Sequence, residues 1–213
     1  MNLLLPVLAG AAIGYFLGAI PFGLLAGRLA RKGDLREYGS GKTGFTNALR
    51  TLGLRWALFV ILGDVLKGTV AVLIGRYLIG EPAAAAAAGF AAVFGHVFPV
   101  YAGFRGGRGV ATAFGAFLGV SPPAALALAL CGAAILAIWR YASLMSVTGV
   151  AAGLVVIGVM TAVGRLDPAY ALLFAVPTAT LVEVSHIPNI RRLLAGTEPK
   201  LGQGGTRRVP GAS

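Results

Sequence analysis

Two stretches of the sequence combine arginine, hydroxyl and amide side chains with closely spaced glycines, a combination suited to binding phosphate groups. The first spans residues 39–50 (GSGKTGFTNALR), and the second spans residues 95–112, where Arg105 and Arg108 flank two glycines. A guanidinium group binds phosphate through a planar fork of donors. Glycines let backbone N–H groups turn toward one anion, and a helix beginning near Thr46 would add its positive end.

Two smaller polar stretches follow later in the chain. Ser146 stands near the start of an apolar run, where a serine also serves simply as a helix cap. His186 and Asn189 share one face if the last helix continues through Pro188. No cysteine or carboxylate cluster accompanies the two histidines of the chain, which disfavours a metal site. A Ser–His–Asp triad also lacks an obvious acid.

Simpler interpretations exist for the first two stretches. The triplet Gly41-Lys42-Thr43 is shared with P-loops, but Arg36 stands where the first P-loop glycine belongs and no strand precedes it. A flexible connector would not need so many hydroxyls and amides. A positively charged membrane anchor would explain Arg105 and Arg108, but not the glycines and His96 beside them.

The elements that must position these residues are strongly apolar. The chain has 213 residues, of which 57% are hydrophobic and 12% charged, with a mean hydropathy of +0.84. Soluble domains carry about 25% charged residues. This composition excludes a disordered chain, a nucleic-acid-binding arm and almost any water-soluble fold. A single cysteine excludes an internal disulfide framework.

A helix needs about 20 mainly apolar residues to cross a bilayer, and we predict an all-α, polytopic membrane protein with seven transmembrane helices. The predicted spans are 2–27, 56–79, 83–101, 110–120, 124–139, 144–163 and 169–184. Pro122 and Pro123 separate the short fourth span from the fifth. The first span lacks the basic leader and cleavage site of a secretory signal. Asp64 and Lys67, three residues apart within the second span, predict an intrahelical ion pair.

The positive charges predict the orientation of these spans. With seven crossings, fifteen of the eighteen basic residues fall in segments on one side, which the positive-inside rule makes cytoplasmic. The N-terminus is then outside and the C-terminus cytoplasmic. We expect one membrane domain over residues 1–201 and a disordered cytoplasmic tail over residues 202–213.

Taken in order, these motifs resemble those of the bacterial acyl-phosphate:glycerol-3-phosphate acyltransferases, the PlsY family. The resemblance rests on residues 39–50, on residues 95–112, and on His186 with Asn189 and the Gly-Thr-Glu run that ends at Glu198. The stretch from Asp64 to Gly68 is also similar. The chain departs from the usual pattern at Lys42, Phe45, Arg105 and Arg108, where the family commonly has Asn, Ala, Lys and Lys.

The resemblance implies a multi-pass enzyme of the bacterial cytoplasmic (inner) membrane with its active site facing the cytoplasm. Such an enzyme transfers a fatty acyl group from acyl phosphate to the 1-hydroxyl of sn-glycerol 3-phosphate. The products are 1-acyl-glycerol 3-phosphate and phosphate, in the first step of phospholipid synthesis. The resemblance further implies no metal, no cofactor and no nucleic acid, and we expect a monomer.

The resemblance also assigns roles to individual residues. The catalytic set is Ser40, Arg50, Arg108, His186 and Asn189. The substrate-binding set is Gly39, Gly41, Thr46, Asn47, His96, Arg105, Gly106, Gly107, Ser146 and Glu198. Two groups compete to accept the hydroxyl proton: an oxygen of a substrate phosphate, or His186.

The main alternative is a small membrane transporter or channel for an anionic solute. Such a protein would show polar residues near the bilayer midplane and an internal repeat. This chain instead concentrates its polar groups on one side and shows no repeat. A lipid phosphatase is a third possibility, but it would need a nucleophile–acid pair that the sequence does not offer.

Overall fold

The computed structural model describes residues 3–203 and residue 206, and the regular elements of this part are helices. The predicted all-α class is therefore confirmed. Most of the predicted tail, 202–213, lies outside the described residues. The α-helices are α1 (Leu4–Gly18), α2 (Phe22–Leu29), α3 (Phe45–Leu52), α4 (Leu54–Leu73), α5 (Pro82–Val97), α6 (Val110–Val120), α7 (Pro122–Trp139), α8 (Ala142–Ala162) and α9 (Val176–Leu194). Short 3₁₀ turns are η1 (Leu35–Glu37) and η3 (Val100–Ala102), and π-helical turns are η2 (Ile74–Ile79) and η4 (Tyr170–Ala175).

Six helical stretches of the described chain are long and apolar enough to cross a membrane, which makes this a multi-pass membrane protein. The seventh apolar helix, α6, has only 11 residues. At 1.5 Å per residue it is about 16 Å long, roughly half the hydrocarbon thickness. Because α6 packs against α4, α5 and α7 and is largely buried, it needs little contact with lipid.

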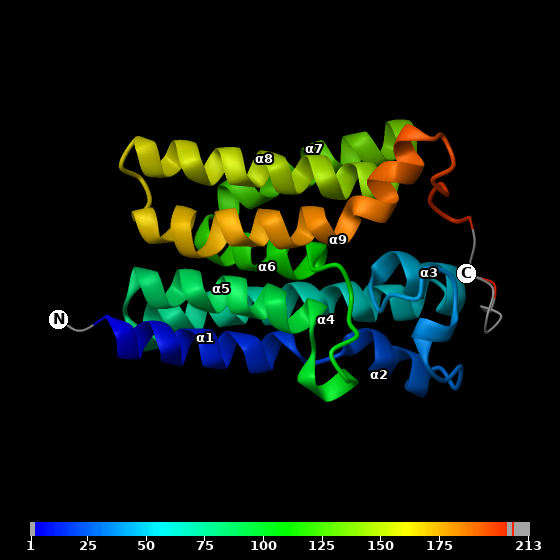
Figure 1. Ribbon diagram of the computed structural model, residues 1–213, viewed down its shortest axis with the longest axis horizontal. Coiled ribbons are helices and arrows are strands. Elements are labelled where there is room, and N and C mark those ends of the chain that lie inside the picture. The colour runs from blue at the N-terminus through cyan, green and yellow to red at the C-terminus, as the bar shows by residue number, and fades with distance from the viewer. Residues whose placement is uncertain (1–2, 204–205, 207–213) are drawn as a thin grey trace.

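Two of the predicted spans differ from the helices in the structure. The run 2–27 is divided into α1 and α2, because Pro21 lacks an N–H group and cannot continue the first helix. The last helix reaches Leu194, ten residues beyond the predicted end at Val184, and contains Pro188. Its C-terminal part bends, as a proline inside a helix causes (Figure 1). The remaining predicted spans match helices with small shifts at their ends.

Small residues allow α1 to lie against α5 almost backbone to backbone. Gly10, Gly14 and Gly18 repeat every four residues along one face of α1, and all three are buried. A Cβ at each would collide with the carbonyl oxygens of Ala84, Ala88 and Ala92, respectively. Packing of this kind is the main source of helix association in a bilayer, where the hydrophobic effect between helices is absent.

The connections at the two ends of the bundle differ in character. The basic segments between α2 and α4, between α5 and α6, and after α9 lie toward one end, together with α3 (Figure 1). The short turns at 80–81 and 163–169 lie at the opposite end. The fold therefore gathers the polar motifs of the sequence at one end of an apolar helical bundle.

Candidate active site

A cavity of about 430 Å³ joins the polar end of the bundle to its apolar interior. The apolar wall comes from side chains of α6, α7 and α8, including Phe114, Leu128 and Leu136. The polar wall consists of Ser40, Lys42, Thr46, Asn47, Asp64, His96, Arg108, Ser146, Thr178 and His186. All four polar stretches of the sequence thus contribute to one cavity.

The structure brings seven of the predicted site residues to this cavity wall: Ser40, Thr46, Asn47, His96, Arg108, Ser146 and His186. Eight others lie outside the lining: Gly39, Gly41, Arg50, Arg105, Gly106, Gly107, Asn189 and Glu198. Of these eight, Gly107 contacts a lining residue directly, through the carbonyl of His96, and the others contact residues outside the lining. Ser146 donates its hydroxyl hydrogen to the carbonyl of Ala142 (2.8 Å), one turn earlier in α8.

Asn47 organises the loop that precedes α3. Its Nδ2 lies within hydrogen-bond distance of the carbonyl oxygens of Leu35 (3.1 Å), Tyr38 (3.0 Å) and Lys42 (2.8 Å). Its Oδ1 accepts the backbone N–H of Ser40 (3.2 Å), and the residue is buried. The Asn47 amide therefore folds the chain around itself and presents Ser40 to the cavity.

The glycines use their backbone N–H groups within the protein. Gly106 donates to the carbonyl of Val97 (3.1 Å), and Gly107 donates to that of His96 (3.2 Å). A Cβ on Gly107 would collide with the imidazole of His96, so only glycine lets the loop lie flat on that ring. Gly41 has a φ of 69° and donates to Tyr38 (2.9 Å), closing the turn before α3. Gly39 likewise donates to Thr206 (3.0 Å). These contacts shape the loops on both sides of the cavity.

Arg108 and Arg50 lie close together at the polar end, with Glu198 as the neighbouring carboxylate. Burial lowers the pKa of Arg108, and the neighbouring charges of Arg192 and Arg50 lower it further against the opposing pull of Glu198. The Nε atoms of Arg108 and Arg50 are buried and have no hydrogen-bond partner in the described part of the chain. Burial also lowers the pKa of Arg50. Arg50 Nη2 donates to the carbonyl oxygens of Pro199 (3.5 Å) and Lys200 (3.3 Å), so the buried atom without a partner in each guanidinium is Nε. A buried donor without a partner is costly unless an anion binds it.

Lys42 lines the cavity together with Arg108, and the sequence motifs give it no role. Burial lowers its pKa, and the charges of Arg108 and Arg105 add to this effect. The proximity of Arg108 could not be read from the sequence, because the two residues belong to different loops. Arg105 itself is exposed and does not line the cavity.

The end of α9 holds His186 and Asn189 in fixed orientations. The helix continues through Pro188, so both residues are buried on one face, as their spacing predicts. His186 Nδ1 lies 2.8 Å from the carbonyl of Val182, which requires Nδ1 to carry the proton and leaves Nε2 as an acceptor in the neutral ring. Asn189 donates to Oε1 of Glu198 (2.7 Å).

Glu198 connects the end of α9 to the chain beyond it. Its second oxygen, Oε2, accepts a hydrogen bond from Nε of Arg192 (2.7 Å). Burial raises the pKa of Glu198, but the bonds from Asn189 and Arg192 outweigh this and hold the pKa below its usual value. Glu198 therefore acts on Asn189 and Arg192 rather than lining the cavity.

The predicted ion pair within α4 is confirmed, and it extends to a third residue. Lys67 Nζ lies 2.8 Å from Asp64 Oδ1, 2.8 Å from His96 Nδ1 and 3.0 Å from the carbonyl oxygen of Ile20. Ile20 lies at the break between α1 and α2, where a helical partner for that carbonyl is missing. An ammonium can only donate, so His96 Nδ1 accepts a hydrogen bond from Lys67 Nζ, and Nε2 carries the hydrogen of the neutral ring.

Among the described residues, no group of three or more histidine, cysteine or acidic residues is placed to hold a metal ion. The arrangement instead offers cations, a serine hydroxyl and an imidazole to anionic groups, next to an apolar channel. It is suited to holding a molecule that carries both a phosphate and a hydrocarbon chain.

Comparison with known proteins agrees with this geometry. A family model described as glycerol-3-phosphate acyltransferase matches residues 8–196. A glycerol-3-phosphate acyltransferase of Brucella anthropi is 45% identical over 202 residues, which cover 94% of this chain and 96% of that protein. One from Agrobacterium fabrum is 44% identical over 195 residues, covering 92% of each.

Two crystal structures of PlsY, an integral membrane glycerol 3-phosphate acyltransferase, share this fold. The glycerol 3-phosphate form has a TM-score of 0.83 and 36% identity, covering 92% of this chain and 96% of that one. The lysophosphatidic acid form has a TM-score of 0.80 and 35% identity, covering 91% and 94%. On the matching of its motifs, its fold and nearly its whole length, the chain belongs to the glycerol-3-phosphate acyltransferase family.

Proposed function

We propose that this acyltransferase uses acyl phosphate as its donor and acylates the 1-hydroxyl of sn-glycerol 3-phosphate, the first step of phospholipid synthesis. The observation that carries the proposal is the cavity, in which the cations Arg108 and Lys42 adjoin an apolar channel between α6, α7 and α8. Both substrates are phosphates, and the donor also carries a hydrocarbon chain. The cavity has a matching region for each part.

Arg108 and Lys42 on the cavity wall, with Arg50 behind them, supply positive charge for two dianionic substrates. Ser40, Thr46 and Ser146 supply hydroxyl donors, and His186 faces the same space. The buried, unpartnered Nε atoms of Arg50 and Arg108 support an anion at this position. Asn47 holds Ser40 by accepting its backbone N–H, and Glu198, bonded to Asn189 and Arg192, supplies a negative charge near Arg108.

The 1-hydroxyl oxygen attacks the acyl carbonyl carbon, the C–O bond to phosphate breaks, and inorganic phosphate leaves. The hydroxyl proton passes to an oxygen of a substrate phosphate, so the enzyme needs no carboxylate base. Because acyl phosphate is an activated donor, positioning and charge stabilisation supply most of the acceleration. His186 Nε2 orients the acceptor, and no metal or cofactor takes part.

The proposed topology has seven crossings, with α6 as the short one, the N-terminus outside and the C-terminus in the cytoplasm. The gathering of basic loops at the α3 end of the bundle supports this orientation under the positive-inside rule (Figure 1). The active site then faces the cytoplasm from the inner membrane, and the protein acts as a monomer.

The test is phosphate release from synthetic palmitoyl phosphate by the purified protein, with and without glycerol 3-phosphate. We expect release that depends on glycerol 3-phosphate and equals the lysophosphatidate formed. Palmitoyl-CoA and palmitoyl-acyl carrier protein serve as matched donors and should support no transfer. Transfer from either of these, with none from palmitoyl phosphate, would overturn the proposed donor.

A further inference from the structure

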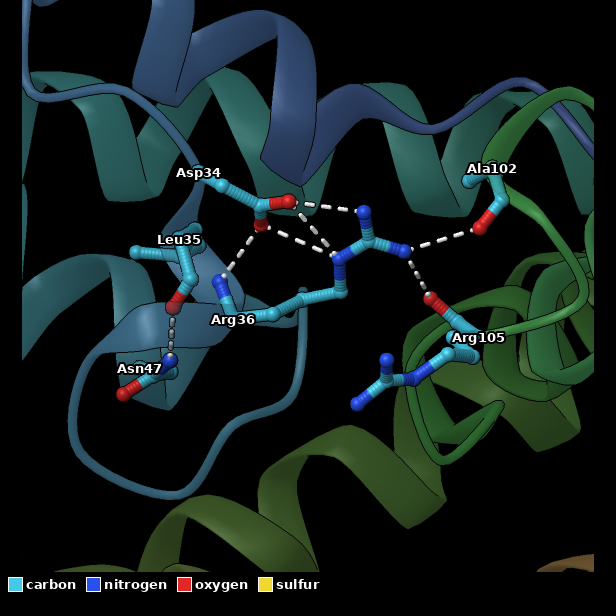
Figure 2. Close-up of polar contacts among 6 residues, drawn as sticks. All are labelled: Asp34, Leu35, Arg36, Asn47, Ala102 and Arg105. Carbon is cyan, nitrogen blue, oxygen red and sulfur yellow. Dashed lines mark hydrogen bonds and ion pairs between the residues drawn. The ribbon is translucent and has the colours of Figure 1, made fainter. Parts of the chain in front are cut away.

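Arg36 joins the two polar loops of the active site, although it lies outside the cavity. Its Nε lies 3.0 Å from both carboxylate oxygens of Asp34, and its Nη2 lies 2.7 Å from Oδ2. The remaining nitrogen, Nη1, donates to the carbonyl oxygens of Ala102 (2.8 Å) and Arg105 (3.2 Å). Figure 2 shows this guanidinium between the carboxylate on one side and the two carbonyls on the other.

The orientation of Arg36 is determined locally. Asp34 Oδ1 also accepts the backbone N–H of Arg36 (2.8 Å), which caps the short turn η1 and places the carboxylate beside the guanidinium. Hydrogen bonding from Arg36 lowers the pKa of Asp34, so the pair is fully charged at neutral pH. The Arg36 and Asp34 side chains are only 23% and 34% exposed. Contacts within its own loop therefore fix the orientation of the Arg36 guanidinium, independently of its contacts with the second loop.

Both loops that Arg36 joins lead directly to cavity residues. On one side, the carbonyl of Leu35 accepts a hydrogen bond from Asn47 (3.1 Å) (Figure 2). The Oδ1 of Asn47 in turn accepts the backbone N–H of Ser40. On the other side, Arg105 lies three residues before Arg108. The segment 34–36 thus sets the separation between the Ser40 wall and the Arg108 wall of the cavity.

We propose that Arg36, aligned by Asp34, is a positioning residue that holds Arg108 in register with Ser40 for binding of the substrate phosphates. The proposal rests on the function proposed above. Arginine is required because a planar fork reaches a carboxylate and two carbonyls at once, which a lysine ammonium cannot do. A displacement of about 1 Å at such a site can cost about 100-fold in rate.

The test is a double-mutant cycle on the purified full-length protein. Arg36→Ala should lower kcat/KM for acyl transfer about 100-fold, since Arg108 loses its alignment. In an Arg108→Ala background the same change should cost less than about threefold, because Arg36 then has nothing left to align. Equal losses in both backgrounds, or no loss in the first, would overturn the proposal.

Two further variants separate alignment from charge and from folding. Lys32→Ala removes an exposed cation from the same loop and should stay within about twofold of the wild type. Arg36→Lys keeps the charge and should still lose about tenfold; full activity would show that the fork is unnecessary. Because Arg36→Lys is the milder change, it carries the same cycle if Arg36→Ala does not fold.

Calorimetric binding of glycerol 3-phosphate tests the positioning role of Arg36 separately from the proposal that acyl phosphate is the acyl donor. The dissociation constant should rise about tenfold in Arg36→Ala and stay unchanged in Lys32→Ala. If wild-type protein binds glycerol 3-phosphate but does not react with palmitoyl phosphate, the proposed donor fails while the positioning role is still measured. Unchanged binding and unchanged kcat/KM in Arg36→Ala would reject the positioning role alone.

Discussion

The molecule contains two groups of buried charge, and they differ in how the charge is balanced. In the first, the Lys67 ammonium is surrounded by the Asp64 carboxylate, His96 and a backbone carbonyl. In the second, the Nε atoms of Arg50 and Arg108 are buried without any hydrogen-bond partner in the described chain. The balanced charge lies at the junction of α1 and α2, whereas the unbalanced charge is where we propose that the substrate anions bind. The difference predicts opposite responses to mutation.

The largest effect is expected from breaking the balanced group. Lys67→Met leaves the buried Asp64 carboxylate unpaired and should lower the free energy of unfolding by about 3–5 kcal/mol. Thermal unfolding of the purified protein measures this loss. The double variant Asp64→Leu with Lys67→Met removes both charges and should recover most of the stability. A double variant as unstable as the single one would show that the loss does not come from an unpaired Asp64 carboxylate.

Removing a charge from the unbalanced group should affect activity instead. Arg108→Ala is expected to lower kcat/KM about 10²–10³-fold, as for other lost anion-stabilising donors, with little change in thermal stability. Arg108→Lys should retain part of the activity. Arg191→Ala, an exposed arginine near the same end of α9, is the control and should behave like the wild type. Equal activity in the wild type and all three variants would show that Arg108 does not stabilise a substrate anion.

A smaller effect is expected at His186, a cavity residue whose imidazole is neutral. His186→Gln keeps a polar side chain but cannot accept a proton, so turnover should fall less than about tenfold if a substrate phosphate is the base. A general base contributes at least about 100-fold. Steady-state kcat at saturating substrate therefore decides the matter, and a loss of that size would assign the proton to His186.

The smallest effect is expected at Glu198, whose carboxylate supplies negative charge near Arg108 and Arg50. The pKa of Glu198 is lower in the folded protein than in the unfolded chain, so its stabilising effect is present above the unfolded pKa. That effect is lost as the pH falls through the folded pKa. The unfolding temperature of the wild type should therefore fall more between pH 7 and pH 4 than that of Glu198→Gln. Parallel curves would show that the bonds to Asn189 and Arg192 contribute nothing.

Several helices and one ion pair could be predicted from the sequence because residues close to them in the chain determine them. The bounds of α6 are those predicted for the fourth span, set by Gly109 before it and the Pro122-Pro123 pair after it. A helix beginning near Thr46 is present as α3, and the Asp64–Lys67 pair follows from helical spacing. The two spans whose ends differ from the prediction each contain a proline, and the two prolines have opposite effects. Pro21 ends α1, whereas Pro188 is accommodated within α9.

The contacts that complete the site could not be predicted in this way. Arg36 reaches carbonyls 66 and 69 residues away, and no pattern of residue types indicates which carbonyl a guanidinium meets. His96 joins an ion pair 29 residues earlier in the chain. The glycines beside it are visible in the sequence, but their closeness to the imidazole depends on how the loop folds back.

By itself, the sequence determined that this chain is a helical membrane protein, and it predicted that the motifs suited to phosphate lie on one side. Hydropathy acts over one helix length, and the motif residues lie within a few positions of one another. Only the tertiary structure decided which of those residues share a cavity and which hold others in place. Burial and charge balance depend on neighbours from several helices. Lys67, in an apolar span, is therefore paired with Asp64, whereas Arg108, in a polar stretch, lines the cavity without an ion pair among the described residues.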